Sequence, residues 1–88
     1  GYTGLSAALH LAQRGIRAIV LEAEEPGFGA SGRNGGHVNP GVYPDPDTVI
    51  AALGEAQGRA LLEASSSAPD FTFDLIKRLG IACDAEQT

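Results

Sequence analysis

Two glycines three residues apart, followed by an acid one strand length later, constrain this sequence more than any other feature. Gly1 and Gly4 open the chain, and Glu22 closes the apolar run 18–21. In the G-x-G-x-x-G fingerprint of dinucleotide-binding folds, a helix leaves the last glycine and an acid follows about 20 residues later, at the end of the second strand. The spacing fits the second and third glycines of that fingerprint. We therefore expect the first strand and the first glycine to precede residue 1.

The hydrophobic pattern predicts a helix from Gly4 to about Arg14 and a strand from Arg17 to Glu22. Gly15 is well placed to end the helix in the left-handed conformation. The run 18–21 is apolar without alternation, which is typical of a parallel strand covered on both faces. The expected fold class is α/β, a truncated Rossmann-like fragment that lacks its first strand and is otherwise mainly helical.

Glycine and proline are concentrated in the middle of the chain. Six of the 12 glycines lie between residues 27 and 41, and three of the five prolines lie between 40 and 46. No regular element tolerates that composition, so residues 24–44 are predicted to form one long loop, and long loops in compact domains are usually functional or disordered. The chain is accordingly divided into 1–23, 24–44 and 45–88.

The last segment has helical periodicity. A helix is predicted to begin near Asp45 or Asp47, with Asp45 able to cap it, and to continue to about residue 64, weakened by internal glycines. The serines at 65–67 predict a break, and a further helix is expected from Pro69 to Leu79, where Gly80 ends it. Residues 81–83 are expected to form another strand or an extended connector.

Composition excludes several classes of function. The net charge of −5 argues against nucleic acid as a partner, because binding to phosphates needs a basic surface. Cys83 is the only cysteine, so no internal disulfide and no metal-ligand set is expected, and a reducing, cytoplasmic location is the default. No window approaches the 18 consecutive apolar residues of a membrane span.

The glycine turn and the acid suit an adenine dinucleotide chemically. A helix N-terminus leaves backbone N–H groups unpaired and carries partial positive charge, so a pyrophosphate can lie there if no side chain intervenes. Glu22 could accept hydrogen bonds from ribose hydroxyls and would repel a 2′-phosphate. The alternatives are a plain turn between a strand and a helix, and a solvated acid at a strand end.

The segment Gly27–Gly36 adds a second set of candidate binding groups. Its glycines let backbone N–H groups approach an anion or a ring edge. Arg33 offers a forked positive charge suited to phosphate oxygens or to bracing the loop, and Asn34 can both donate and accept hydrogen bonds. The alternative is a mobile linker, in which serine and glycine only give flexibility.

Three motifs together resemble one known family. Gly1-Tyr2-Thr3-Gly4, Leu21-Glu22-Ala23 and the run 27–36 are similar to the D-amino acid oxidase-like family of FAD-dependent oxidoreductases, in particular to its gamma-glutamylputrescine oxidoreductase and glycine/D-amino acid oxidase-type members. The likeness covers residues 1 to about 41 strongly and the helical remainder loosely. It implies FAD as the cofactor and twelve residues that hold it, with no catalytic or metal-binding residue in this chain. These are Gly1, Tyr2, Thr3, Gly4, Glu22, Ala23, Ser31, Gly32, Arg33, Asn34, Gly35 and Gly36.

The resemblance also implies an activity. The parent enzyme is expected to oxidise the C–N bond of an amine or amino acid, a small-molecule substrate, while the 88 residues alone are expected to be inactive. The exposed strand 17–22 predicts self-association of the fragment. Two alternatives stay open: another FAD- or NAD-dependent dehydrogenase of the same fold, of hydroxy-acid or glycerol-3-phosphate type, and a non-catalytic helical interaction module. His37 could attach a flavin covalently but is more simply a loop histidine.

Overall fold

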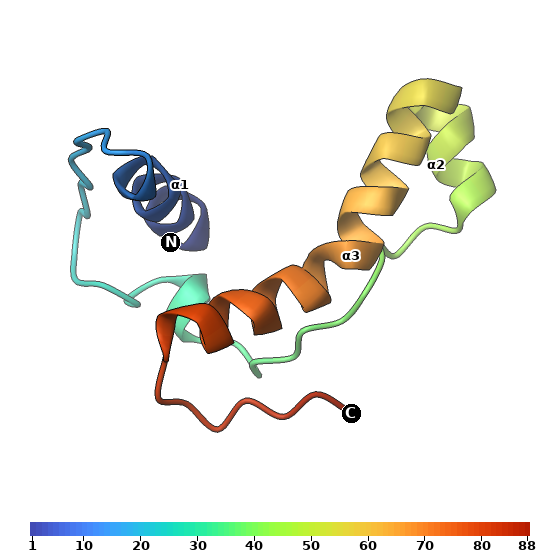
Figure 1. Ribbon diagram of the computed structural model, residues 1–88. Helices are drawn as coiled ribbons and strands as arrows, with labels where there is room; N and C mark the ends of the chain where they lie inside the picture. The colour runs from blue at the N-terminus through green and yellow to red at the C-terminus, as the bar shows by residue number, and fades with distance from the viewer. The chain divides into compact units, whose positions relative to one another are not determined.

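The computed structural model describes residues 1–88 as helices joined by extended segments (Figure 1). The elements are α1 (Tyr2–Gln13), the short 3-10 helix η1 (Ala30–Gly32), α2 (Pro46–Leu53) and α3 (Glu55–Leu79). The chain divides into two compact units, Gly1–His37 and Val38–Thr88. The first unit contains α1 and η1, and the second contains α2 and α3.

Helix α1 forms where the sequence predicts it, beginning two residues earlier than expected. The Leu5 N–H donates to the Gly1 carbonyl at 3.3 Å, so the first helical turn includes the glycine pair itself. At the other end, Gly15 adopts a φ of +74°, as predicted for the residue that ends the helix. The Ile16 N–H donates to the Leu11 carbonyl at 2.9 Å and closes that end.

The strand predicted from Arg17 to Glu22 is wrong for these residues. The segment has no ladder partner, because the described residues contain no strand at all, and a strand exists only through hydrogen bonds to a neighbour. Residues 81–83 likewise form no strand. Ile19 and Leu21 are 89% and 90% exposed. Residues 17–22 thus have the composition of a strand but pair with no other segment of the chain.

Helix α2 begins at the predicted cap. The Thr48 N–H donates to Asp45 Oδ1 at 3.0 Å, and the Thr48 hydroxyl donates to Oδ2 at 2.7 Å. Both hydrogen bonds lower the pKa of the Asp45 carboxyl from its ordinary value, and the bond from the Thr48 hydroxyl has the larger effect. Pro46 occupies the first turn, where a missing N–H costs nothing.

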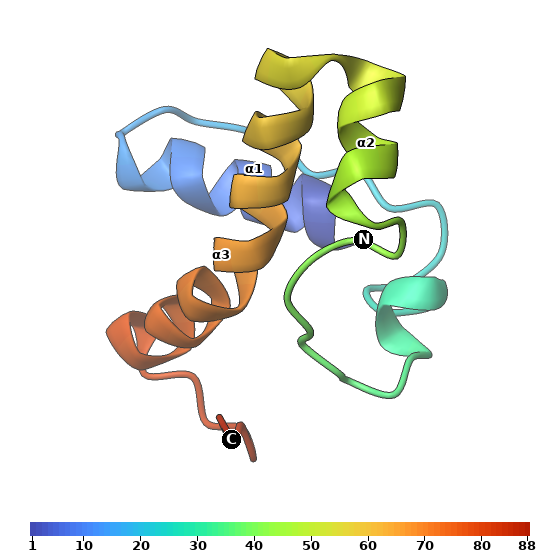
Figure 2. The same ribbon diagram turned by 90° about the vertical axis from the view of Figure 1, so that its right-hand side faces the viewer.

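The single helix expected from Asp45 to residue 64 is wrong, because the chain turns at Gly54. Its φ of +83° is a left-handed conformation that ends α2, and α3 begins at the next residue. The two helices therefore pack side by side as a hairpin, which both Figure 1 and Figure 2 show. Gly58 is buried at this contact, and a Cβ there would lie 2.9 Å from Ile50 Cα. Val49 is the one buried hydrophobic residue of the chain.

Helix α3 continues through the break predicted at Ser65–Ser67. The three serine hydroxyls donate to carbonyls three or four residues earlier, so they are satisfied inside the helix. Pro69 lies within α3 and cannot donate to the Ser65 carbonyl. The Gly41 N–H donates to that carbonyl instead, at 3.0 Å.

A bend in the middle of α3 is visible in both ribbon views, as expected of a proline inside a helix. The predicted C-terminal end is confirmed. Leu79 is the last helical residue, and Gly80 has a φ of +61°.

Candidate functional site

The first turn of α1 presents the backbone groups that the glycine motif predicts. Because the N–H groups of a helix's first turn have no intrahelical acceptor, those of Tyr2, Thr3 and Gly4 need partners from elsewhere. The Tyr2 N–H donates to Ser31 Oγ at 3.2 Å. Thr3 and Gly4 are exposed residues of this first turn, which is the positive end of the helix dipole. This leaves a place where an anionic group can be held.

Glu22 lies beside the same turn although its strand is not formed. Its Oε2 atom is 3.9 Å from the Gly1 nitrogen, and its Oε1 accepts a hydrogen bond from the Glu24 N–H at 3.2 Å. The Glu22 side chain is 38% exposed, so its carboxylate can still accept a hydrogen bond from outside the protein. The acid and the glycine turn, separated by a strand length in sequence, are therefore adjacent in space.

Residues 27–36, which contain η1 and are called the η1 loop below, fold onto the start of α1. Ser31 caps the Tyr2 N–H, and a Cβ on Gly1 would lie only 2.9 Å from the Ser31 Oγ atom. Asn34 Nδ2 lies 3.0 Å from the Tyr2 hydroxyl oxygen and donates to it. Ser31 thus contacts the backbone of Tyr2, and Asn34 contacts its side chain.

Two glycines give the loop its shape. A Cβ on Gly32 would lie 1.9 Å from the Gly27 carbonyl oxygen, so only glycine permits this crossing of two backbone segments. Gly36 has a φ of +71°, and its N–H donates to Asn34 Oδ1 at 2.8 Å. The close approach at Gly32 is to the protein's own backbone, and the predicted approach of these glycines to an anion or a ring edge stays a prediction.

Arg33 extends over an aromatic ring of the same loop. Its guanidinium carbon lies 4.7 Å from the centroid of the Phe28 ring, which is a cation–π contact. This contact holds the one positive charge of the loop near its glycine-rich turn. Phe28 was missed by the sequence reasoning, and so was Ala30, whose carbonyl accepts from Asn34 Nδ2 at 3.1 Å. No spacing rule in the sequence pairs either residue with its partner.

The structure therefore joins six of the predicted residues by direct contacts: Gly1, Tyr2, Glu22, Ser31, Asn34 and Gly36. Outside the backbone of α1 itself, no atom lies within 4 Å of the position that a Cβ on Gly4 would take. No contact of this kind ties Ala23 to the turn.

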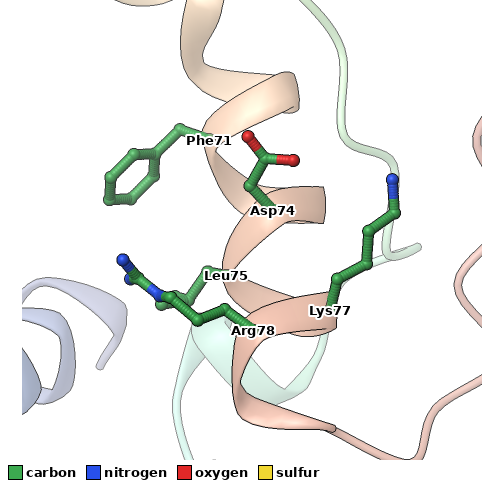
Figure 3. A pocket seen from close by; sticks show the side chains of 5 residues that line it. All are labelled: Phe71, Asp74, Leu75, Lys77 and Arg78. Carbon is green, nitrogen blue, oxygen red and sulfur yellow. The ribbon is translucent and has the colours of Figure 1, made fainter.

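The second unit contains a separate shallow hollow along α3, lined by Phe71, Asp74, Leu75, Lys77 and Arg78 (Figure 3). Figure 3 shows Lys77 and Arg78 extending to opposite sides of the helix, so their charges do not converge on one point. Nothing in this hollow matches a predicted site. No helix of the chain is both long enough and apolar enough to cross a membrane.

Comparison with known proteins decides which family these features belong to. The sequence profile of the family described as "FAD dependent oxidoreductase" matches residues 1–88. The chain belongs to this family. The expected resemblance is confirmed, and with it the assignment to a family that is FAD-dependent.

Several curated relatives are similar to this chain. It is 44% identical over 84 residues to the gamma-glutamylputrescine oxidoreductase of Escherichia coli, and 42% identical over 84 residues to the "Probable oxidoreductase OrdL" of Haemophilus influenzae. Each match covers 96% of this chain, and the chain spans about a fifth of the length of these relatives. A bifunctional protein of tRNA 5-methylaminomethyl-2-thiouridine biosynthesis from a Polaromonas species is 38% identical over 71 residues, 80% of this chain and 11% of the relative. No solved structure matches significantly.

The donor set of the first unit fits FAD. Backbone N–H groups at a helix N-terminus suit a pyrophosphate, and a carboxylate beside them suits ribose hydroxyls. A side chain at position 1 would displace the Ser31 hydroxyl that accepts from the Tyr2 N–H. A carboxylate this close to the turn also disfavours a ligand with an additional 2′-phosphate.

Proposed function

We propose that the unit Gly1–His37 is part of the FAD-binding site of an oxidoreductase that oxidises the C–N bond of an amine or amino acid. The observation that carries the proposal is the convergence of the α1 N-terminus, Glu22 and the η1 loop within this one unit. Family membership supports the cofactor. The name of the gamma-glutamylputrescine oxidoreductase, a relative at 44% identity, supports an amine substrate.

The binding roles follow from the chemistry of each group. The N–H groups of Thr3 and Gly4 would donate to the pyrophosphate oxygens, and Glu22 would accept from the ribose hydroxyls. Arg33 would add positive charge close to the phosphates. FAD supplies the electron acceptor, while the chain's own residues bind and orient it. All twelve residues inferred from the family likeness stay candidates for this role, and none is assigned to catalysis.

A graft tests the proposal in a complete enzyme. The 84-residue segment of the Escherichia coli gamma-glutamylputrescine oxidoreductase that aligns with this chain is replaced by this chain's residues. The purified protein is then assayed for bound flavin and for oxidation of gamma-glutamylputrescine. We expect flavin at close to one equivalent and measurable turnover. A folded graft that is colourless and does not respond to added FAD would contradict the proposal.

Paired substitutions in the graft test the role of the acid. Glu22→Ala should weaken FAD binding by roughly tenfold or more, because a hydrogen bond to a charged group contributes about 1.5–3 kcal/mol. Glu25→Ala removes a neighbouring acid and is the matched control, for which little change is expected. Equal effects of the two substitutions would show that net charge, and not a ribose contact, governs binding.

For the 88 residues alone, we propose that FAD is not retained stoichiometrically and that no turnover occurs. An absorption spectrum of the purified chain tests this, because a flavin band at one equivalent would refute it. We also propose that the exposed segment 17–22 promotes self-association. A reducing, cytoplasmic location stays a prediction that depends on the single cysteine.

A further inference from the structure

Asn34 makes its hydrogen bonds within the protein. Its Nδ2 lies within hydrogen-bond distance of three oxygens: the Tyr2 hydroxyl at 3.0 Å, the Ala30 carbonyl at 3.1 Å and the Ser31 carbonyl at 3.2 Å. Its Oδ1 accepts from the Gly36 N–H at 2.8 Å. A carboxamide has two N–H hydrogens, so three acceptors already share both of them. The side chain therefore has no donor left for a cofactor.

Tyr2 is bound to the same loop at both ends. Its backbone N–H donates to Ser31 Oγ at 3.2 Å, and its hydroxyl oxygen accepts from Asn34 Nδ2. These two contacts join residues 29 and 32 positions apart in the sequence. They are the side-chain hydrogen bonds that fix the η1 loop on the first turn of α1.

We propose that Tyr2 and Asn34 are positioning residues, which together form a Tyr2–Asn34 clasp that closes the loop 30–36 onto the α1 N-terminus before any cofactor binds. The consequence for binding rests on the proposed function: FAD affinity depends on the two side chains through the loop and not through contact with them. The family likeness implied direct contact for both residues. The clasp replaces that implication with an indirect role, in which they preset the position of Ser31 and the glycine-rich turn.

Nuclear magnetic resonance on the full 88-residue chain without cofactor tests the clasp. Tyr2→Phe removes only the phenolic oxygen, so hydrogen exchange of the Asn34 carboxamide should speed up by about three- to tenfold, the effect of losing one neutral hydrogen bond. Exchange of the Gly36 amide should not change, because its acceptor is retained. Tyr43→Phe makes the same substitution at a fully exposed tyrosine and is the matched control. Unchanged Asn34 exchange in Tyr2→Phe would overturn the proposal.

Substitution of Asn34 separates its two functions. Asn34→Asp keeps an oxygen for the Gly36 N–H but cannot donate, so the Gly36 amide should stay protected while the Tyr2 amide loses protection. Asn34→Ala should expose both amides. If Asn34→Asp behaved like the unsubstituted chain, donation by the carboxamide would be irrelevant and the clasp would be refuted.

FAD titration of the graft described above connects the clasp to binding. Tyr2→Phe should lower FAD affinity by about three- to tenfold, in parallel with the faster Asn34 exchange. Weaker FAD binding with unchanged exchange would mean that the tyrosine contacts the cofactor directly, which overturns the clasp and leaves the proposed function intact. Faster exchange with unchanged affinity would also overturn it. Loss of all FAD binding by the unsubstituted graft would refute the proposed function alone, since the exchange experiment needs no cofactor.

Discussion

Alanine at Gly32 should detach the η1 loop from α1, whereas alanine at Gly29, three residues earlier, should not. A Cβ on Gly32 would lie 1.9, 2.6 and 2.8 Å from the oxygen, carbonyl carbon and Cα of Gly27. All three atoms belong to the backbone, so no side-chain rotation relieves the clash, and the two segments must move apart by about 1 Å or more. No atom lies within 4 Å of the equivalent position on Gly29, whose φ of −83° suits any residue.

Overpacking of this kind costs about 1–3 kcal/mol, which corresponds to roughly a 5- to 150-fold shift toward the open loop. Hydrogen exchange of the Tyr2 and Arg33 amides measures that shift, because both donate to atoms of the loop, at 3.2 and 3.1 Å. Gly29→Ala should leave both rates within about a factor of two, as surface substitutions typically do. If Gly32→Ala and Gly29→Ala gave the same exchange rates, the backbone crossing would not hold the loop.

Three further outcomes are expected. Gly58→Ala should lower the free energy of unfolding of the α2–α3 hairpin by about 1–2 kcal/mol, measured by thermal unfolding followed by circular dichroism. The clash of the new Cβ with the Ile50 backbone outweighs a gain of about 1 kcal/mol in helix propensity. Folding lowers the pKa of the Asp45 carboxyl from its ordinary value of 3.8. The ionised cap should therefore stabilise α2 fully above that value, and this stabilisation should be lost as the pH falls through the lower pKa of the folded state. The pH titration of the Thr48 amide resonance follows this, and Asp45→Asn should abolish it. Ile19→Lys should reduce self-association in sedimentation equilibrium, and an unsubstituted chain that stays monomeric at high concentration would argue against that interface.

Helix ends were the most predictable part of the fold, because they depend on local chemistry. Gly15 and Gly80 end helices in the left-handed conformation, and the Asp45 carboxylate binds an amide three residues later. Each is a property of a few consecutive residues. The sequence also identified which segments form the candidate site, because the glycine turn, the acid and the loop have characteristic compositions.

The failures have a common physical cause, which is dependence on distant partners. The segment 17–22 has strand composition, but pairing needs a neighbour that these residues do not include. The serines at 65–67 resemble a break only if their hydroxyls are assumed to cap a new helix. In the structure they donate backwards to carbonyls of the same helix. Likewise, the sequence could assign Asn34 to the site but could not show that its donors face Tyr2.

The proline inside α3 gives the long loop a fixed attachment point. Since Pro69 cannot donate, the Ser65 carbonyl is open on the flank of the helix, and the Gly41 amide occupies it. The hydrogen bond from Gly41 to Ser65 can form only once this turn of α3 exists. The chain around Gly41 should therefore become ordered after the helix and not before it. A mutational scan confined to the loop would miss the residue that creates its anchor, which lies 28 positions further along the chain.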